Sequence, residues 1–288
     1  MTHIMEALGK AKVYIENGKI KKIEEPKLKY CPLFNKKKNI KTIDKESIKN
    51  NIEERIKNFG LFTKSRILDE EEDVIHFGVS EILSTSLKNN LIDTTITVCD
   101  GAGTVITSNP ALVQSIGGHL SGLIQTEPIP EIIENIENKN GFVIDKKYAS
   151  INQLQGVKDA IKYGYQRIAV TVSSIKDIIK IRSFEKEHYS EFQKRNIIII
   201  LLAVHTSEMS KQDAMILSQN VDIATACASK NIRELKPLFQ VGVSIPLFAF
   251  SNIGKLLLIE RIKDVKIPIV SFSQELPFLK KEQPYNLF

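Results

Sequence analysis

The sequence predicts an α/β protein: a mainly parallel sheet with helices on both faces, preceded by a smaller α+β N-terminal region with a β-hairpin. From Ile92 onward, short apolar runs alternate with amphipathic stretches, which is typical of parallel strands joined by helical crossovers. The chain of 288 residues is long enough for one large domain or two modest ones. We expect a basic α+β region over 1–90 and an α/β domain with a glycine-rich loop over 91–288.

The first elements are read from local signals. "AKVYI" alternates, "ENG" supplies a turn and "KIKKI" returns, so a hairpin is predicted over 11–24. The prolines of "EEPKLKYCPLF" predict an extended segment there. A helix follows between Asp44, a good N-cap residue, and Gly60, with isoleucines at every fourth position. A second helix is predicted over 74–88, after an acidic run that suits its positive end.

Eight strands and seven helices are predicted after Ile92. Each apolar run of strand length is bounded by turn residues, and each helix candidate has an amphipathic repeat. The strands are Thr94–Cys99, Phe142–Ile144, Arg167–Val172, Ile197–Ala203, Val221–Ala226, Val241–Val243, Leu247–Phe250 and Ile267–Phe272, and the helices are Pro110–Ile116, Pro130–Asn138, Asn152–Tyr163, Ile175–Glu187, Lys211–Gln219, Ile232–Phe239 and Ile253–Ile262.

Charge is unevenly distributed along the chain. The formal net charge is +6, but residues 1–60 hold 15 Lys/Arg against 8 Asp/Glu, which is +7, and the rest of the chain sums to −1. Because no aromatic or arginine clustering accompanies the basic segment, we expect no nucleic acid as partner. The N-terminus lacks the apolar core of a signal peptide, and the most apolar run is the eight residues of Ile197–Val204. No membrane span is therefore expected, and we expect a cytoplasmic protein.

Three cysteines and a histidine suggest a metal or thiol site. Cys99, His205 and Cys227 each lie at the end of a predicted strand, where ligands of open parallel sheets bind. If Cys31 folds across the same edge, two or three thiolates and an imidazole would suit zinc, iron or an iron-sulfur cluster. The alternative is that these cysteines only pack in the core. No pattern of catalytic residues is present, so catalytic residues stay unassigned.

A glycine-rich stretch suggests an anion site at the same edge. After its first four residues, "TVCDGAGTVITSNPALVQSIGGHLSGLIQT" has no charged side chain, and glycine turns and helix N-termini can hold a phosphate or carboxylate through backbone amides. It matches no established nucleotide-binding motif, and the alternative is a buried loop whose glycines allow close packing. The predicted ligand or anion-binding residues are Asp100, Gly101, Gly103, Thr104, Gly117, Gly118 and His119.

Several segments resemble a known family. "EALGKAKVYIENGKIKKIEEPKLKYCPLF", "FGVSEILSTSLKNNLIDTTITVCDGAGTVITSNPALVQSIGGHLSGLIQTEPIPE", "RIAVTVSS", "AVHTSEMSKQDA" and "DIATACASKNIREL" are similar to the eighth of the methanogenesis marker proteins, an archaeal family of unknown function. The resemblance implies a role tied to methyl-coenzyme M reductase, its nickel tetrapyrrole or its activation. It supplies no catalytic residues.

Three functions are therefore expected as alternatives. The first is assistance in assembly, maturation or activation of methyl-coenzyme M reductase, with the reductase or its activation machinery as partner. The second is a small-molecule enzyme of methanogen cofactor metabolism, with an active site at the carboxyl ends of the strands. The third is a non-catalytic scaffold whose basic first 60 residues bind an acidic partner.

Overall fold

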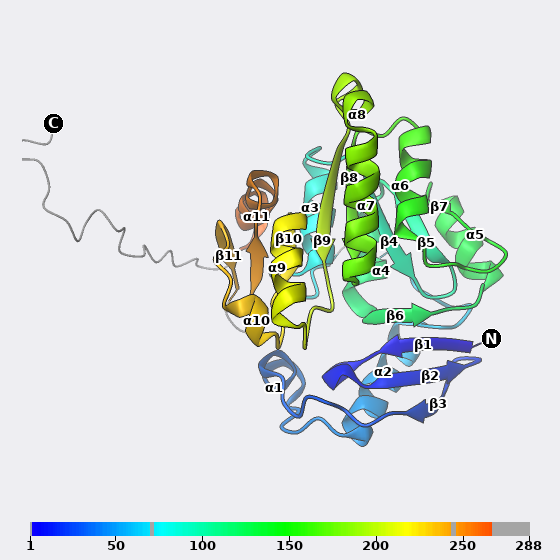
Figure 1. The fold of residues 1–288 in the computed structure, drawn as a ribbon. Helices are drawn as coiled ribbons and strands as arrows, with labels where there is room; N and C mark the ends of the chain where they lie inside the picture. Colours follow the sequence, from blue (N-terminus) through cyan, green and yellow to red (C-terminus); the bar gives the residue numbers. More distant parts are fainter. Residues whose placement is uncertain (1, 70–71, 243–245, 267–288) are drawn as a thin grey trace, which may run out of the picture.

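The structure, a computed structural model, describes residues 2–69, 72–242 and 246–266 (Figure 1). It contains two sheets, twelve helices and twelve strands within these residues. The strands are β1 Thr2–Glu6, β2 Lys12–Glu16, β3 Lys19–Ile23, β4 Thr94–Cys99, β5 Gly103–Thr107, β6 Gly122–Gln125, β7 Phe142–Val143, β8 Arg167–Val172, β9 Ile198–Ala203, β10 Ile223–Thr225, β11 Phe239–Val241 and β12 Leu247–Ala249. The helices are η1 Leu8–Lys10, α1 Pro32–Lys38, α2 Lys45–Phe59, α3 Val79–Lys88, α4 Pro110–His119, α5 Pro130–Asn138, α6 Gln153–Lys162, α7 Ile175–Glu187, α8 Tyr189–Arg195, α9 Lys211–Asn220, α10 Lys230–Arg233 and α11 Asn252–Asp264.

The large sheet has eight strands in the order β11-β12-β10-β9-β8-β4-β5-β7. Its four central strands, β10, β9, β8 and β4, run parallel, whereas the pairings on both flanks are antiparallel. Three of the seven pairings are therefore parallel, and the sheet is mixed instead of mainly parallel as predicted. One cause of the difference is the tight turn after Cys99. It makes β5 pair antiparallel with β4, where the sequence predicted a loop.

Helices cover both faces of this sheet, as predicted. One core layer joins α6, α7 and α9 to one face, with Val157, Ile178 and Leu217 buried against the strands. The other joins α3 and α11 to the opposite face, with Ile82 and Leu257 as members. Because both faces are covered, the central strands are rich in apolar and β-branched residues on both sides, and β9 is apolar throughout.

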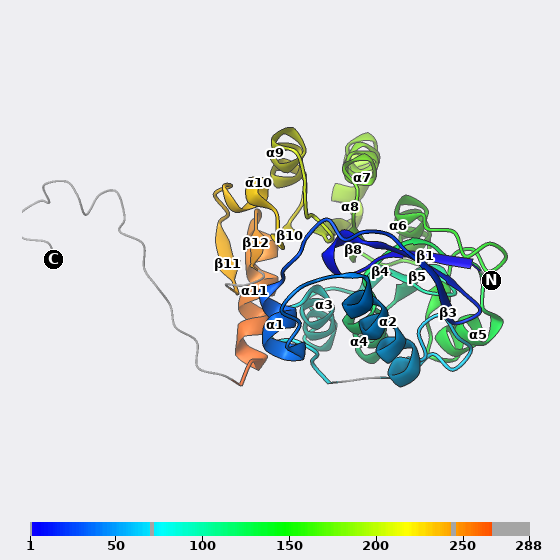
Figure 2. The same cartoon turned by 90° about the horizontal axis from the view of Figure 1, so that it is seen from below.

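The small sheet is antiparallel, in the order β3-β2-β1-β6. The predicted hairpin forms its β2 and β3, and its core packs against α2 through Ile48 and Ile52. Strand β6 comes from residues 122–125, and α3 from residues 79–88 packs with α4 and α11. The two sheets thus exchange elements across the expected boundary at residue 90. Figure 1 shows the small sheet, α1 and α2 lying beyond one end of the strands of the large sheet, and Figure 2 views the molecule from that side.

Helix α2 forms where its caps predict. The Asp44 side chain accepts from the backbone N–H of Ser47 at 2.7 Å, and the Ser47 hydroxyl accepts from the Asp44 N–H at 2.9 Å. At the other end Gly60 has φ of 67°, and a Cβ there would lie 2.1 Å from the Ser65 carbonyl oxygen. Both ends are thus fixed by sequence, because only glycine fits the second position.

Most predicted elements are present, with errors at irregular segments. Helix α3 begins at Val79 because residues 74–78 form a loop, and α1 replaces part of the predicted extended segment. The predicted helix Ile232–Phe239 is wrong: α10 ends at Arg233, and Phe239 begins β11. The predicted strand Ile267–Phe272 lies outside the described residues, as does Val243. Within the described ranges, every helix is too short or too polar to cross a membrane.

Candidate functional site

A cavity of about 1030 Å³ lies at the carboxyl ends of the four parallel strands. One wall is formed by residues that follow these strands, including Ser173, His205 and Cys227. The opposite wall comes from the N-terminal elements: η1, the segment before α1, and α2. The space between the ends of β4, β8, β9 and β10 and the N-terminal elements is thus a partly open cavity at the position where α/β sheets bind ligands.

His205 projects into this cavity from the end of β9. Its backbone is left-handed, with φ of 56°, and its ring packs on Gly122 of β6, where a Cβ would lie 3.2 to 3.3 Å from the ring atoms. More than a third of the His205 surface is exposed, into the cavity, but the surrounding protein removes much of its hydration and, together with the Lys10 ammonium, lowers its pKa to about 4 from the ordinary 6.5. The imidazole is therefore neutral at physiological pH and can accept a proton or a hydrogen bond.

Two of the three cysteines face the same cavity. Cys227 follows β10 and Cys31 precedes α1, and both are half-buried cavity residues. Burial raises the pKa of the Cys227 thiol, and Cys31 adds to this effect, while the Arg233 guanidinium opposes it. Cys227 is consequently a protonated thiol at neutral pH, able to donate a proton.

Helices α3 and α4 form a third wall. Gly117 of α4 lies so close to α3 that a Cβ there would be 2.8 Å from the Ser80 Cβ, and Gly118 and His119 continue the lining. These two glycines lie inside α4, which runs on to His119 and is therefore longer than the predicted Pro110–Ile116. The His119 ring stacks on Phe59 with centroids 3.4 Å apart. Three predicted anion-site residues, Gly117, Gly118 and His119, thus do reach the cavity.

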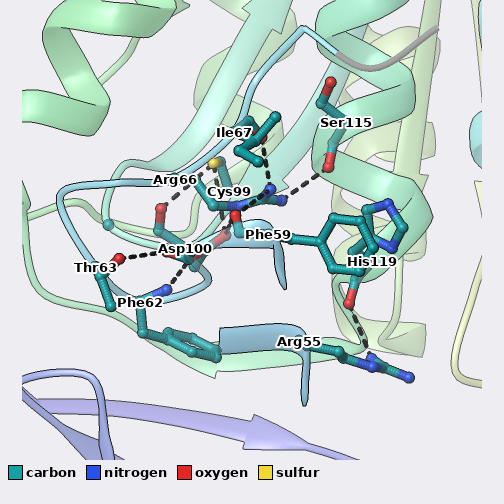
Figure 3. A network of polar contacts seen from close by, with 12 residues as sticks. Arg55, Phe59, Phe62, Thr63, Arg66, Ile67, Cys99, Asp100, Ser115 and His119 are labelled. Atoms are coloured by element: carbon teal, nitrogen blue, oxygen red, sulfur yellow. Dashed lines mark hydrogen bonds and ion pairs between the residues drawn. The ribbon is translucent and has the colours of Figure 1, made fainter. Parts of the chain in front are cut away.

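Cys99 and Asp100 are part of a buried network outside the cavity (Figure 3). The Asp100 carboxylate accepts from Arg66 Nε at 3.0 Å and from the Phe62 backbone N–H at 2.6 Å, and the side chains of this ion pair are at most 1 % exposed. Burial and Asp100 raise the pKa of the Cys99 thiol well above its ordinary value. Cys99 packs in the core with Leu68 and Leu112, as the alternative interpretation predicted.

The amides of the glycine turn are taken by the protein itself. Gly101 N–H donates to the Thr126 hydroxyl at 2.8 Å, and Thr104 N–H donates to the Ser150 carbonyl at 3.1 Å. Both glycines have positive φ, and a Cβ at Gly103 would lie 2.2 Å from the Ala149 carbonyl oxygen. The expected anion cradle of Asp100, Gly101, Gly103 and Thr104 is corrected: these residues build a tight, packed β4–β5 turn.

The proposed four-ligand metal site is not assembled either. Cys99 lies in the core, whereas Cys31, His205 and Cys227 face the cavity. Over the part of the chain that the structure describes, no three His, Cys, Asp or Glu side chains are placed to hold a metal ion together. The sequence correctly placed His205 and Cys227 at one edge, but β4 ends in a hairpin turn that directs Cys99 away from them.

Arg55 was missed in the sequence and is a cavity residue. Asn51, Arg55 and Phe59 recur at every fourth position of α2, beside the isoleucine stripe, and all three line the cavity. This spacing could have predicted the role of Arg55, because it places a positive charge on the same side of α2 as residues that turn toward the protein interior.

Comparison with known proteins gives the family. Residues 3–263 match the family described as "Uncharacterized protein conserved in archaea (DUF2099)". The chain belongs to this family. A relative from the methanogen Methanocaldococcus jannaschii, "Uncharacterized protein MJ0054", is 47% identical over 288 residues, which is 99% of each chain. No solved structure matches the chain.

Proposed function

We propose that the chain is a small-molecule enzyme of methanogen cofactor metabolism whose active site is the cavity at the carboxyl ends of β4, β8, β9 and β10. The observation that carries the proposal is the joint presence of His205, Cys227 and Cys31 in the lining of one cavity of about 1030 Å³. Pockets for small molecules and cofactors are of this size, largely apolar, with a few polar groups that fix the ligand. The relative in a methanogen supports the metabolic setting.

His205 and Cys227 are the candidates for proton transfer in this cavity. A neutral imidazole accepts a proton and a protonated thiol donates one, and both groups have pKa values shifted by enclosure in the direction that keeps them uncharged. A pKa of about 4 makes the imidazole a weak base, and a raised pKa makes the thiol a weak acid. The two groups are therefore suited to hydrogen-bond a substrate, and proton transfer requires a substrate that moves their pKa values toward neutrality. The protonation state of Cys227 argues against a resting thiolate nucleophile.

The experiment uses a substitution that fills the cavity. Ser173 follows β8, is exposed within the cavity and makes no hydrogen bond to the described residues. Ser173→Trp therefore occupies cavity volume without removing a native contact. Ser190→Trp, at an exposed position of α8, is the matched control.

Wild type and both variants are purified without oxygen from a methanogen host and compared by native mass spectrometry. We expect wild type and Ser190→Trp to retain the same small molecule at one per chain, and Ser173→Trp to lose it. Equal retention by Ser173→Trp, with its fold intact, contradicts a site in this cavity. Absence of any ligand from wild type, together with failure of small-molecule extracts to raise its thermal stability, contradicts the proposal as a whole.

Assistance in assembly, maturation or activation of methyl-coenzyme M reductase is the second proposal. It is favoured by the methanogen relative and by the basic first 60 residues, whose exposed lysines, including Lys41, Lys49 and Lys57, offer a surface for an acidic protein. Pull-downs from methanogen extract test it at low and high salt. Recovery of reductase components that weakens with salt supports this role, because exposed charges are screened within about 10 Å at 0.1 M salt. Recovery of none contradicts it, and recovery of another acidic protein supports the scaffold.

A further inference from the structure

Arg55 enters the cavity from α2 with much of its guanidinium unused. Its Nη1 donates to the His119 carbonyl at 2.9 Å and to the Ser121 hydroxyl at 2.9 Å. Figure 3 shows this single nitrogen directed at His119, with the outer edge of the guanidinium pointing away from the network. Nε and Nη2 donate to none of the residues that the structure describes. Capping the end of α4 thus accounts for one nitrogen of three.

The cavity carboxylates are already engaged by other groups. Glu54, next in sequence to Arg55, pairs with Lys38, and Glu6 lies 3.8 Å from Lys10. Glu81 accepts from the backbone N–H groups of Val74 and Ile75, each at 3.1 Å, and from the side chains of Ser80 and Gln114. Within the described ranges, Arg55 has no carboxylate at ion-pair distance.

The Glu54 charge acts on Arg55 but forms its ion pair with Lys38, so the cavity position of Arg55 without a direct ion pair among the described residues is informative. Burial lowers the pKa of the guanidinium to about 10, so it stays charged at neutral pH. An enclosed charge without an ion partner is unfavourable unless something else compensates it. Three N–H groups in a rigid planar fork are suited to a carboxylate, sulfonate or phosphate, which can accept two parallel hydrogen bonds.

We infer that Arg55 binds the anionic end of the cavity's ligand, and that the ligand is an amphiphilic oxyanion whose apolar body extends toward His205 and Cys227. The apolar body follows from the apolar side chains of the same cavity lining, which include Leu8, Phe77 and Val113. The inference rests on the proposed function, because it names the class of molecule that the same site takes.

Two dyes of nearly the same shape test the charge requirement. 1-Anilinonaphthalene-8-sulfonate carries a sulfonate on an aromatic body, and N-phenyl-1-naphthylamine is its uncharged counterpart. Both become fluorescent when they leave water for an apolar cavity. Their affinities are measured for the full chain, for Arg55→Met, for Arg55→Lys and for the control Lys57→Met, which removes a positive charge from an exposed position of the same helix.

We expect Arg55→Met to weaken binding of the sulfonate dye at least about tenfold relative to the neutral dye, since hydrogen bonds to charged groups are lost. Lys57→Met should leave the ratio of the two affinities unchanged, and Arg55→Lys should restore part of it. Ser173→Trp should reduce binding of both dyes, which places them in the cavity.

The outcomes separate the inference from the proposed function. If both dyes bind the wild type and Ser173→Trp displaces them, but Arg55→Met leaves the affinity ratio unchanged, the role of Arg55 is wrong and the cavity stands. If neither dye binds the wild type, or if Ser173→Trp displaces neither, the cavity is not a ligand site and both fail. Loss of neutral-dye binding in Arg55→Met would show that Arg55 only maintains the shape of the cavity, which also overturns the inference.

Discussion

Asp100→Asn should destabilise the folded chain severely without affecting the cavity directly. The Asp100 carboxylate is fully buried and accepts from both Arg66 Nε and the Phe62 N–H. Asparagine keeps one acceptor oxygen, so its amide group faces one of these two donors, and Arg66 loses its counter-charge. Removing one partner of a buried ion pair costs about 3 to 5 kcal/mol. That is a large share of the 5 to 15 kcal/mol by which folded domains are usually stable.

The assay is urea unfolding at neutral pH, followed by circular dichroism. Glu191→Gln is the matched control, because Glu191 pairs with Arg195 on the surface of α8 with both side chains more than 40% exposed. Such a pair contributes about 0.3 to 0.5 kcal/mol. A loss below about 1 kcal/mol for Asp100→Asn, with an unchanged dependence on urea, would refute the conclusion that this ion pair ties the β4–β5 turn to the segment after α2.

Three further predictions concern the glycine turn, the thiols and the histidine. Gly103→Ala should lower the free energy of unfolding by about 3 kcal/mol or more, because its Cβ would lie 2.2 Å from a carbonyl oxygen. Gly164 also has positive φ but has nothing within 4 Å of a Cβ, so Gly164→Ala should cost only about 1 to 2 kcal/mol. Equal losses in urea unfolding would show that the contact at Gly103 is unimportant. Iodoacetamide should modify Cys227 in the folded protein and Cys99 only after unfolding, as followed by peptide mass spectrometry, and equal rates would place Cys99 at an accessible surface. The wild type should lose stability as pH falls from 6.5 to about 4, because the unfolded chain takes up a proton at His205 that the folded chain does not, and His205→Gln should lose that part of the slope; identical slopes would mean that His205 titrates normally.

Local signals predicted the central sheet well. Thr94–Cys99 and Arg167–Val172 form strands with the predicted bounds, because short runs rich in β-branched residues and bounded by turns favour strands. Capping residues fixed both ends of α2 for a similar reason. These features depend on neighbours in sequence, which a single sequence shows directly.

The site was only partly predictable. His205 and Cys227 were placed at the right edge, since parallel strands bring their carboxyl ends together. Asp100 and Gly103 were predicted to bind a ligand. That prediction was wrong because the local sequence of a glycine turn is the same whether its amides bind an anion or other parts of the protein. Only tertiary contacts, from Thr126, Ser150 and Arg66, decide between them.

The cover of the cavity could not be predicted at all. Residues far apart in sequence form it: Lys10 of η1 donates to the Ser207 carbonyl at 2.8 Å, and β6 pairs with β1. The periodicity of a segment does not predict these contacts, because its hydrophobic pattern is the same whether it packs over the carboxyl ends of the strands or elsewhere.

A crystal structure of the protein purified without oxygen from a methanogen host tests the central claim most directly. We expect a small molecule in the cavity, with an anionic group at Arg55 and its other end beside His205 and Cys227. A ligand or metal ion bound instead at Cys99 or on the amides of the β4–β5 turn would contradict it.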